Sequence, residues 1–244
     1  MTSPKALLLA IAAAAALLGT AATKAEAVNT LSATYYSVAP GDADFQSYCC
    51  GTFNNQVTGT LGPDGLPVFN PAYGGPTIHD VNSSGEITWW SPALNHHVTL
   101  SGTGTVALPY SNTAFYPPVG NGSSDTNAFQ TAVFSGMLNL PKAEAVTFTA
   151  GADDSVFAYV DGNAVINLGG VHPDTAASGT TSVLSAGSHS LKVFYADLYR
   201  TQAALSFAIT TKDVTTTPVP EPASLALLGL GVLSIGWVRR RRAA

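Results

Sequence analysis

Short runs of β-branched and aromatic residues, separated by turn-forming Gly, Pro, Asn and Asp, most constrain how this chain can fold. The clearest pair, residues 156–160 and 164–168, is joined by Asp161-Gly162-Asn163, which predicts a tight hairpin. Further runs predict strands at residues 57–61, 68–69, 87–90, 98–108, 132–140, 146–150, 191–195 and 205–210. This spacing, without a long amphipathic helix, predicts an all-β fold of sandwich or barrel type.

Charge narrows the range of partners. Residues 28–218 hold four basic and thirteen acidic residues, and therefore carry a net charge of −9. A surface this acidic disfavours nucleic acid as a partner, because the phosphate backbone requires basic side chains. Residues 28–218 are long enough to form one domain with a substantial core.

The amino-terminal segment has the pattern of a secretory signal peptide. Lys5 precedes an apolar stretch, Ala6 to Leu18, and Ala25-Glu26-Ala27 has the small residues that signal peptidase accepts. Thirteen apolar residues are too few for a stable membrane span. We therefore expect residues 1–27 to be removed and the mature chain to begin near Val28.

The carboxyl-terminal segment combines three features. Residues 223–238 are apolar, four arginines follow at Arg239, Arg240, Arg241 and Arg242, and Val219-Pro220-Glu221-Pro222 precedes them. By the positive-inside rule the arginines stay in the cytoplasm, which orients the domain outward. A sixteen-residue helix rises about 24 Å against a hydrocarbon core of about 30 Å, so it is a marginal transmembrane helix.

This order of features resembles the PEP-CTERM sorting signal. The resemblance implies that residues 219–244 are a sorting tail recognised by the membrane enzyme exosortase and cut near the Pro-Glu-Pro motif. A plain membrane anchor is the alternative. Residues 212–218, rich in threonine, are expected to form an extended linker before the tail.

The only cysteines are adjacent, Cys49 and Cys50. Three states remain open for them: a strained vicinal disulfide, disulfides to other molecules, or free or buried thiols. Without a nearby His or Cys at ligand spacing, the pair does not predict a zinc site.

The densest polar cluster surrounds Asp153 and Asp154. These adjacent carboxylates precede the strand expected at 155–160, and Asn163 and Asn167 follow it. Neighbouring carboxylates repel each other unless a cation or hydrogen-bond donors compensate. Calcium accepts carboxylate and amide oxygens at flexible angles, although a solvated Asp-Asp turn is the commoner structure.

Residues 151–172, GADDSVFAYVDGNAVINLGGVH, resemble the core of fibro-slime domains, a branch of the PA14-like β-sandwich group. Residues 57–70 and 184–199 are similar to further segments of those domains. The resemblance implies an antiparallel β-sandwich of PA14 type over residues 28–211, between the signal peptide and the transmembrane sorting helix.

In sugar-binding PA14 adhesins, two adjacent aspartates joined by a cis peptide help to hold a calcium ion that binds sugar hydroxyls. Asp153 and Asp154 match that pair, which implies calcium as a cofactor. The chain departs from the pattern at Ala152, Asn167 and residues 197–199, where acidic or charged residues are replaced. Fewer charges imply weaker calcium binding or a lost site, although Asn167 still offers a carbonyl oxygen.

Histidines and aromatic residues supply weaker candidates. Adjacent strand residues such as His96 and His97 point to opposite faces and cannot easily share a metal ion, and His172 is expected to be a structural hydrogen-bond partner. Trp89 and Trp90 are expected in the core. Phe115 and Tyr116, beside a proline-rich segment, are candidate glycan contacts.

Together these patterns predict a non-enzymatic protein that is exported and then held at the cell surface or in the extracellular matrix. Its expected activity is calcium-assisted binding of carbohydrate or exopolysaccharide. A structural biofilm-matrix protein without a specific ligand is the alternative. Catalysis is disfavoured because no serine has a Gly-x-Ser-x-Gly context, and adjacent carboxylates cannot flank a scissile glycosidic bond.

Overall fold

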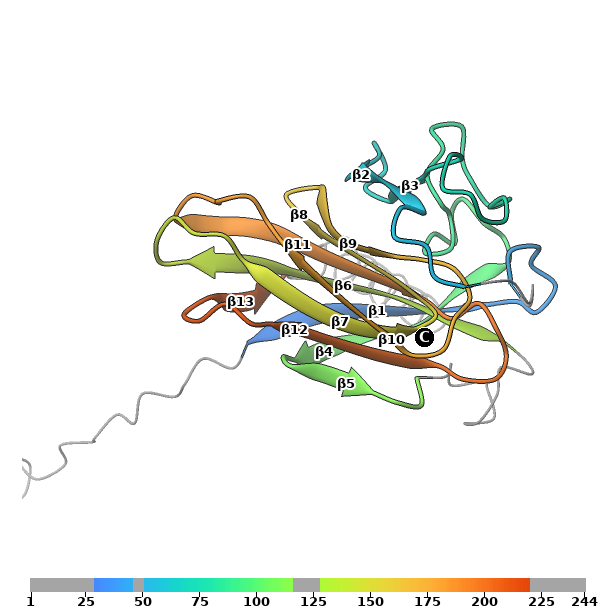
Figure 1. The fold of residues 1–244 in the computed structure, drawn as a ribbon. Helices are drawn as coiled ribbons and strands as arrows, with labels where there is room; N and C mark the ends of the chain where they lie inside the picture. The colour runs from blue at the N-terminus through green and yellow to red at the C-terminus, as the bar shows by residue number, and fades with distance from the viewer. Residues whose placement is uncertain (1–28, 46–50, 116–127, 220–244) are drawn as a thin grey trace, which may run out of the picture.

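The computed structural model describes residues 29–45, 51–115 and 128–219, and these residues form thirteen strands and no helix (Figure 1). The strands are β1 (Thr30–Val38), β2 (Val57–Leu61), β3 (Pro67–Phe69), β4 (Val98–Ala107), β5 (Tyr110–Asn112), β6 (Phe129–Leu140), β7 (Thr147–Asp153), β8 (Ser155–Val160), β9 (Asn163–Leu168), β10 (Thr175–Thr180), β11 (Gly187–Ala196), β12 (Ala204–Ile209) and β13 (Thr215–Pro218).

The strands form two antiparallel sheets. The larger sheet has nine strands in the order β3-β2-β9-β8-β11-β6-β1-β4, with β13 also paired to β6. The smaller sheet has the order β10-β7-β12-β5. Because β7 and β12 belong to one sheet while β8 and β11 belong to the other, the β7–β8 and β11–β12 connections both cross between sheets.

The main core lies between the two sheets. Val156, Ala158 and Tyr195 from the larger sheet contact the cluster that includes Phe148 and Phe207 from the smaller sheet, and all five are buried. These side chains alternate along their strands, as expected when one face of each sheet is covered.

A second core covers the opposite face of the larger sheet. Phe157 and Phe194 point away from the main core and pack with Trp90, whose ring centroid lies 5.0 Å from that of Phe194. Trp89 is fully buried in the same cluster. The described residues of the segment 39–97, which are 39–45 and 51–97, therefore supply the cover of this face, and β8 is buried on both sides.

The predicted hairpin is confirmed as β8 and β9, with Asp161 and Gly162 at φ values of 47° and 75° in the turn. The strand predicted at 98–108 is confirmed as β4, which ends the larger sheet and has a register shift opposite Tyr35 and Tyr36. The strand predicted at 87–90 is wrong. Ile87 makes one isolated bridge to Val81, and its neighbours are held by core packing.

The segment expected to be a linker needs a correction. Residues 215–218 form β13, which pairs with β6, and Thr216 is buried and donates its N–H to Asn29 Oδ1 at 2.8 Å. The sheet therefore extends to residue 218.

Several predictions fall outside the described residues: the signal peptide 1–27, Cys49 and Cys50, Tyr116, and the tail from Pro220 onward. Over the three described ranges, no helix has the length and apolar character needed to cross a bilayer.

Candidate functional site

The candidate site lies where the chain crosses from the smaller to the larger sheet. Asp153 is the last residue of β7, Asp154 follows it, and β8 begins at the next residue. The peptide between the two aspartates is cis. Tyr195 in β11 fixes this corner by donating its hydroxyl to the Asp153 carbonyl at 2.5 Å.

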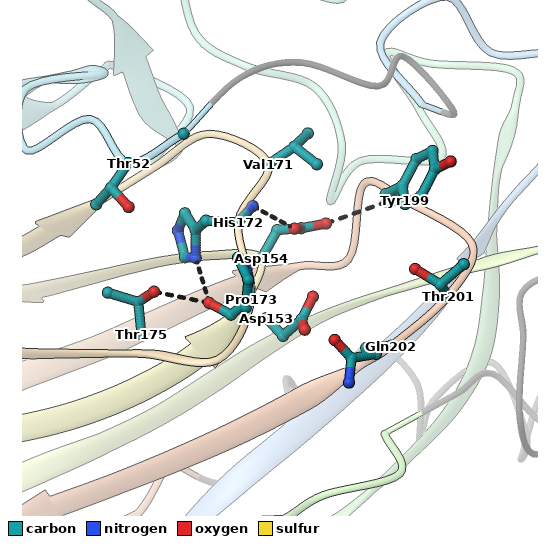
Figure 2. A pocket seen from close by; sticks show the side chains of 11 residues that line it. Thr52, Asp153, Asp154, Val171, His172, Pro173, Thr175, Tyr199, Thr201 and Gln202 are labelled. Atoms are coloured by element: carbon teal, nitrogen blue, oxygen red, sulfur yellow. Dashed lines mark hydrogen bonds between the residues drawn. The ribbon is translucent and has the colours of Figure 1, made fainter.

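Backbone donors from two loops hold the Asp154 carboxylate. Oδ1 accepts the N–H of His172 at 2.9 Å, and Oδ2 accepts the N–H of Tyr199 at 3.1 Å (Figure 2). Oδ2 also accepts the N–H of Leu198 at 2.7 Å. Asp154 is 1% exposed. One buried carboxylate thus joins the β9–β10 loop to the β11–β12 loop.

A pocket of about 420 Å³ opens beside the two carboxylates. We call it the aspartate pocket; its lining residues are Gly51, Thr52, Asp153, Asp154, Val171, His172, Pro173, Thr175, Tyr199, Thr201 and Gln202. Figure 2 shows the Asp153 carboxylate directed toward the side lined by Thr201 and Gln202. The described lining includes hydroxyl and amide groups but no lysine or arginine.

Burial disfavours the ionised form of both carboxyl groups. It raises the pKa of Asp154 to about 8, with a further rise from the charge of Asp153, while the three backbone donors oppose the shift. Burial also raises the pKa of Asp153 to about 6, and nearby Asp174 adds to the rise. Ionising both carboxylates near neutral pH therefore requires a nearby positive charge, and the described lining of the pocket contains no lysine or arginine that could supply it.

These groups fit a hard divalent cation. Calcium prefers six to eight oxygen ligands from carboxylates, amides, hydroxyls and carbonyls. Asp153 and Asp154 supply the charge, and Thr201 and Gln202 line the same pocket with neutral oxygens. A carboxylate oxygen has two lone pairs, so Asp154 can accept backbone hydrogen bonds and still bind an ion.

The two predicted asparagine ligands are not part of this arrangement, which corrects the sequence-based set. Asn163 pairs with Val160 at the far end of the β8–β9 hairpin, about 20 Å from Asp154 at 3.3 Å per residue. Asn167 uses its amide to bridge β9 to β2, donating to the Val57 carbonyl at 2.7 Å. Antiparallel pairing carries both side chains away from the corner.

Phe115 is a core residue, which corrects its assignment as a glycan contact. It is 6% exposed, and its ring centroid lies 5.0 Å from that of Tyr195 and 5.9 Å from that of Tyr35. Trp89 and Trp90 are buried as predicted.

We expect Phe115→Ala to lower the free energy of unfolding by about 3–5 kcal/mol, because it leaves a cavity in the main core. Chemical denaturation measures this loss. Phe115→Leu, which fills most of the volume, should recover much of the stability. An Ala variant with normal stability and impaired glycan binding would restore the contact role.

His172 keeps the structural role that was predicted, and it also faces the pocket. Its N–H holds Asp154, and its Nδ1 lies 2.9 Å from the Pro173 carbonyl, so Nδ1 carries the proton. Burial lowers the pKa of the ring, which favours the neutral form. Its Nε2 is buried without a hydrogen-bond partner among the described residues.

The β11–β12 loop, with Tyr199, Thr201 and Gln202, was not predicted as part of the site. The strand registers explain its position: Ala196 pairs with Ser155, and Ala204 pairs with Asp153, so the loop between them must pass the Asp corner. A correct strand order would have identified it. The sequence alone shows only that its polar residues follow a strand.

A second acidic group, also not predicted, lies in the segment that covers the larger sheet. Carboxylate atoms of Asp42, Asp44 and Asp80 lie within 4.8 Å of one another, so this group could hold a metal ion. Asp44 already accepts four hydrogen bonds, including Trp89 Nε1 at 2.9 Å and the His79 N–H at 2.7 Å. These bonds give Asp44 a structural role whether or not an ion binds.

Two family models match this chain. A model of the PA14 domain matches residues 119–222, and a model of the PEP-CTERM protein-sorting motif matches residues 218–242. The PA14 match includes the Asp corner and both loops that meet there. It leaves out the segment 39–97.

Individual relatives are more distant. Protein psiD of Dictyostelium discoideum is 27% identical over 203 residues, which are 72% of this chain and 40% of that protein. The chain therefore spans less than half of that relative. The PA14 sugar-binding domain from an RTX adhesin has 15% identity and a TM-score of 0.37, with 78% of this chain and 96% of that chain covered. The PA14 domain of the MpAFP antifreeze protein has 16% identity and a TM-score of 0.37, with 79% and 92% covered.

The predicted resemblance to PEP-CTERM proteins with a PA14-like domain is thus confirmed, while its assignment to the fibro-slime branch stays a prediction. The sorting motif indicates an exported, membrane-anchored precursor. The chain, all-β over its described residues, thus matches the PA14 domain model at residues 119–222 and the PEP-CTERM protein-sorting motif at residues 218–242.

Proposed function

We propose that the protein is a non-enzymatic, calcium-assisted carbohydrate-binding module that acts at the cell surface or in the extracellular matrix. Asp153 and Asp154 hold the ion in this proposal, with Thr201 and Gln202 as further oxygen donors. A bound calcium ion would supply a Lewis-acidic centre that accepts vicinal sugar hydroxyls. Signal peptidase and an exosortase-type enzyme would process the two ends of the chain.

One observation carries the proposal: two buried carboxylates meet at one edge of a pocket whose described lining has hydroxyl and amide groups but no lysine or arginine. Burying uncompensated negative charge is costly, and a divalent cation removes the cost.

A specific observation also favours the alternative of a structural matrix protein. Three backbone N–H groups already bind both oxygens of Asp154, so this side chain stabilises two loops without any ligand. In that case Asp154 would be needed for folding, and the protein would bind neither calcium nor a particular glycan.

A glycan array probed with the purified protein separates the two functions. We expect binding to a defined set of glycans in calcium chloride, and at least a tenfold lower signal after chelation with EGTA, because the ion makes direct sugar contacts. Replacing calcium by magnesium should not restore the signal, since magnesium keeps its water ligands and requires a tighter octahedral geometry. Absence of glycan binding in calcium would leave the structural role.

A further inference from the structure

A second, smaller pocket shares Val171 with the aspartate pocket. Its volume is about 120 Å³, and we call it the side pocket. Its lining residues are Ala43, Asp44, Gln56, Tyr73, Pro76, Thr77, Ile78, His79, Gly170, Val171 and Leu198. Most of these residues belong to the segment 39–97, outside the matched PA14 region.

The side pocket has a fixed polar group at its edge. His79 Nδ1 lies 3.0 Å from Asp44 Oδ1, and the His79 N–H donates to the same oxygen at 2.7 Å. A carboxylate only accepts, so Nδ1 carries the proton and Nε2 of the neutral ring is an acceptor. The His79 side chain is 63% exposed, whereas the side chain of Asp44 is 1% exposed. A buried carboxylate therefore orients an imidazole that remains accessible to a ligand.

The remaining walls combine apolar and polar surface. Tyr73 is buried, and its hydroxyl donates to the Pro76 carbonyl, so its ring has a fixed position. Gln56 accepts the Gly170 N–H at 3.2 Å, which ties the segment 39–97 to the β9–β10 loop. An aromatic ring, an aliphatic wall and an oriented hydrogen-bonding group are a usual combination in small-ligand sites.

The two pockets adjoin. Val171 lines both of them, and the consecutive residues Leu198 and Tyr199 line the side pocket and the aspartate pocket respectively. Asp154 binds the N–H groups of both residues, so one carboxylate sets the spacing between the pockets.

Building on the carbohydrate-binding function proposed above, we propose that the side pocket is a second sugar subsite, with His79 as its polar contact. The protein then recognises two or more linked sugars of a polysaccharide chain, instead of one terminal sugar. The aspartate pocket and calcium hold one unit, and the side pocket holds a neighbouring unit. The segment 39–97 determines which chains fit.

An array that presents each sugar both as a monosaccharide and as chains of two to four units tests this inference. Wild-type protein should bind chains about fivefold to tenfold more strongly than the matching monosaccharide, the gain expected from one or two additional hydrogen bonds. His79→Ala should remove this gain and keep the monosaccharide signal. Thr77→Trp, which fills the side pocket from an exposed position, should have the same effect without removing a hydrogen bond.

His96→Ala is the matched control, because His96 is exposed and lines neither pocket. All variants should keep the wild-type calcium affinity. Thr77→Trp and His96→Ala should also keep the unfolding midpoint, whereas His79→Ala should lower it because buried Asp44 loses one of its four hydrogen bonds. Equal binding of monosaccharides and chains by the wild type would overturn the subsite while leaving the proposed function intact. So would an unchanged preference for chains in both His79→Ala and Thr77→Trp. If the wild type bound no glycan, the proposed function and the subsite would both be wrong.

Discussion

Calcium affinity is expected to fall by more than about a hundredfold when Asp153 and Asp154 are both replaced by asparagine. Affinity in calcium sites varies over several orders of magnitude with the number of charged ligands, and this change removes two charges at nearly constant volume. Calorimetric titration with calcium chloride measures the loss, and the glycan array should lose its calcium-dependent signal in parallel.

The two aspartates should differ in their effect on stability. Asp154 accepts three backbone hydrogen bonds, so Asp154→Asn turns an amide group toward at least one donor and should cost about 1–3 kcal/mol. Asp153→Asn alone should therefore reduce calcium affinity with the smaller loss of stability. This single variant separates ion binding from folding.

Asp64→Asn/Asp213→Asn is the control for net charge. Both residues are exposed, neither lines the aspartate pocket, and the variant removes the same two charges. Its calcium affinity should match the wild type. If Asp153→Asn/Asp154→Asn also matches the wild type while Asp80→Asn abolishes binding, the ion belongs to the Asp42–Asp44–Asp80 group, and the proposed site is wrong.

The all-β class and the β8–β9 hairpin could be predicted because they follow from local sequence. Residues 161–163 favour positive φ in a tight turn, and this preference acts over a few residues. The prediction of a strand at 87–90 was wrong because tertiary packing, which local sequence does not show, determines the conformation there. Its aromatic residues satisfy strand propensity, yet Trp89 and Trp90 serve the second core and make no ladder.

Of the candidate site, only the pair Asp153 and Asp154 could be predicted from local sequence. Adjacent aspartates signal charge repulsion in the sequence itself, whereas their neighbours depend on which strands pair. Asn163 and Asn167 are close to the aspartates along the chain, but the hairpin directs them elsewhere. Thr201 and Gln202 lie almost fifty residues away along the chain, and the pairing of β12 with β7 brings their loop to the corner. The chemistry of adjacent carboxylates thus identified Asp153 and Asp154, whereas the strand order determines that Thr201 and Gln202 lie beside them.

Without calcium, the protein should become less stable as the pH rises. The folded state raises the pKa of Asp154 to about 8 and that of Asp153 to about 6, from an ordinary value of 3.8. The folded state therefore binds more protons than the unfolded state between these values. The stability is fully present below pH 3.8 and is lost as the pH rises through the folded pKa of each group.

Each pKa unit corresponds to about 1.4 kcal/mol, so the full shifts would give roughly 9 kcal/mol. Water that reaches the ionised groups screens most of this effect, and we expect a loss on the order of 3 kcal/mol. This loss should lower the Tm by about 10 °C for a domain of this size. Thermal unfolding in EGTA across this pH range measures the slope. Saturating calcium should reverse it, because the ion binds the ionised carboxylates and stabilises the folded state most at high pH.

Two variants show which carboxyl groups cause the dependence of Tm on pH. Burial and the neighbouring Asp42 and Asp44 also raise the pKa of Asp80 to about 8, so Asp80 contributes with the same sign. Asp153→Asn/Asp154→Asn should remove most of the slope together with the effect of calcium, whereas Asp80→Asn should reduce the slope and leave the calcium effect intact. A Tm that rises with pH in EGTA, or a calcium effect that persists without Asp153 and Asp154, would contradict the assignment. The proton and the calcium ion thus compete for the same two carboxylates, and acidification should release the glycan along with the ion.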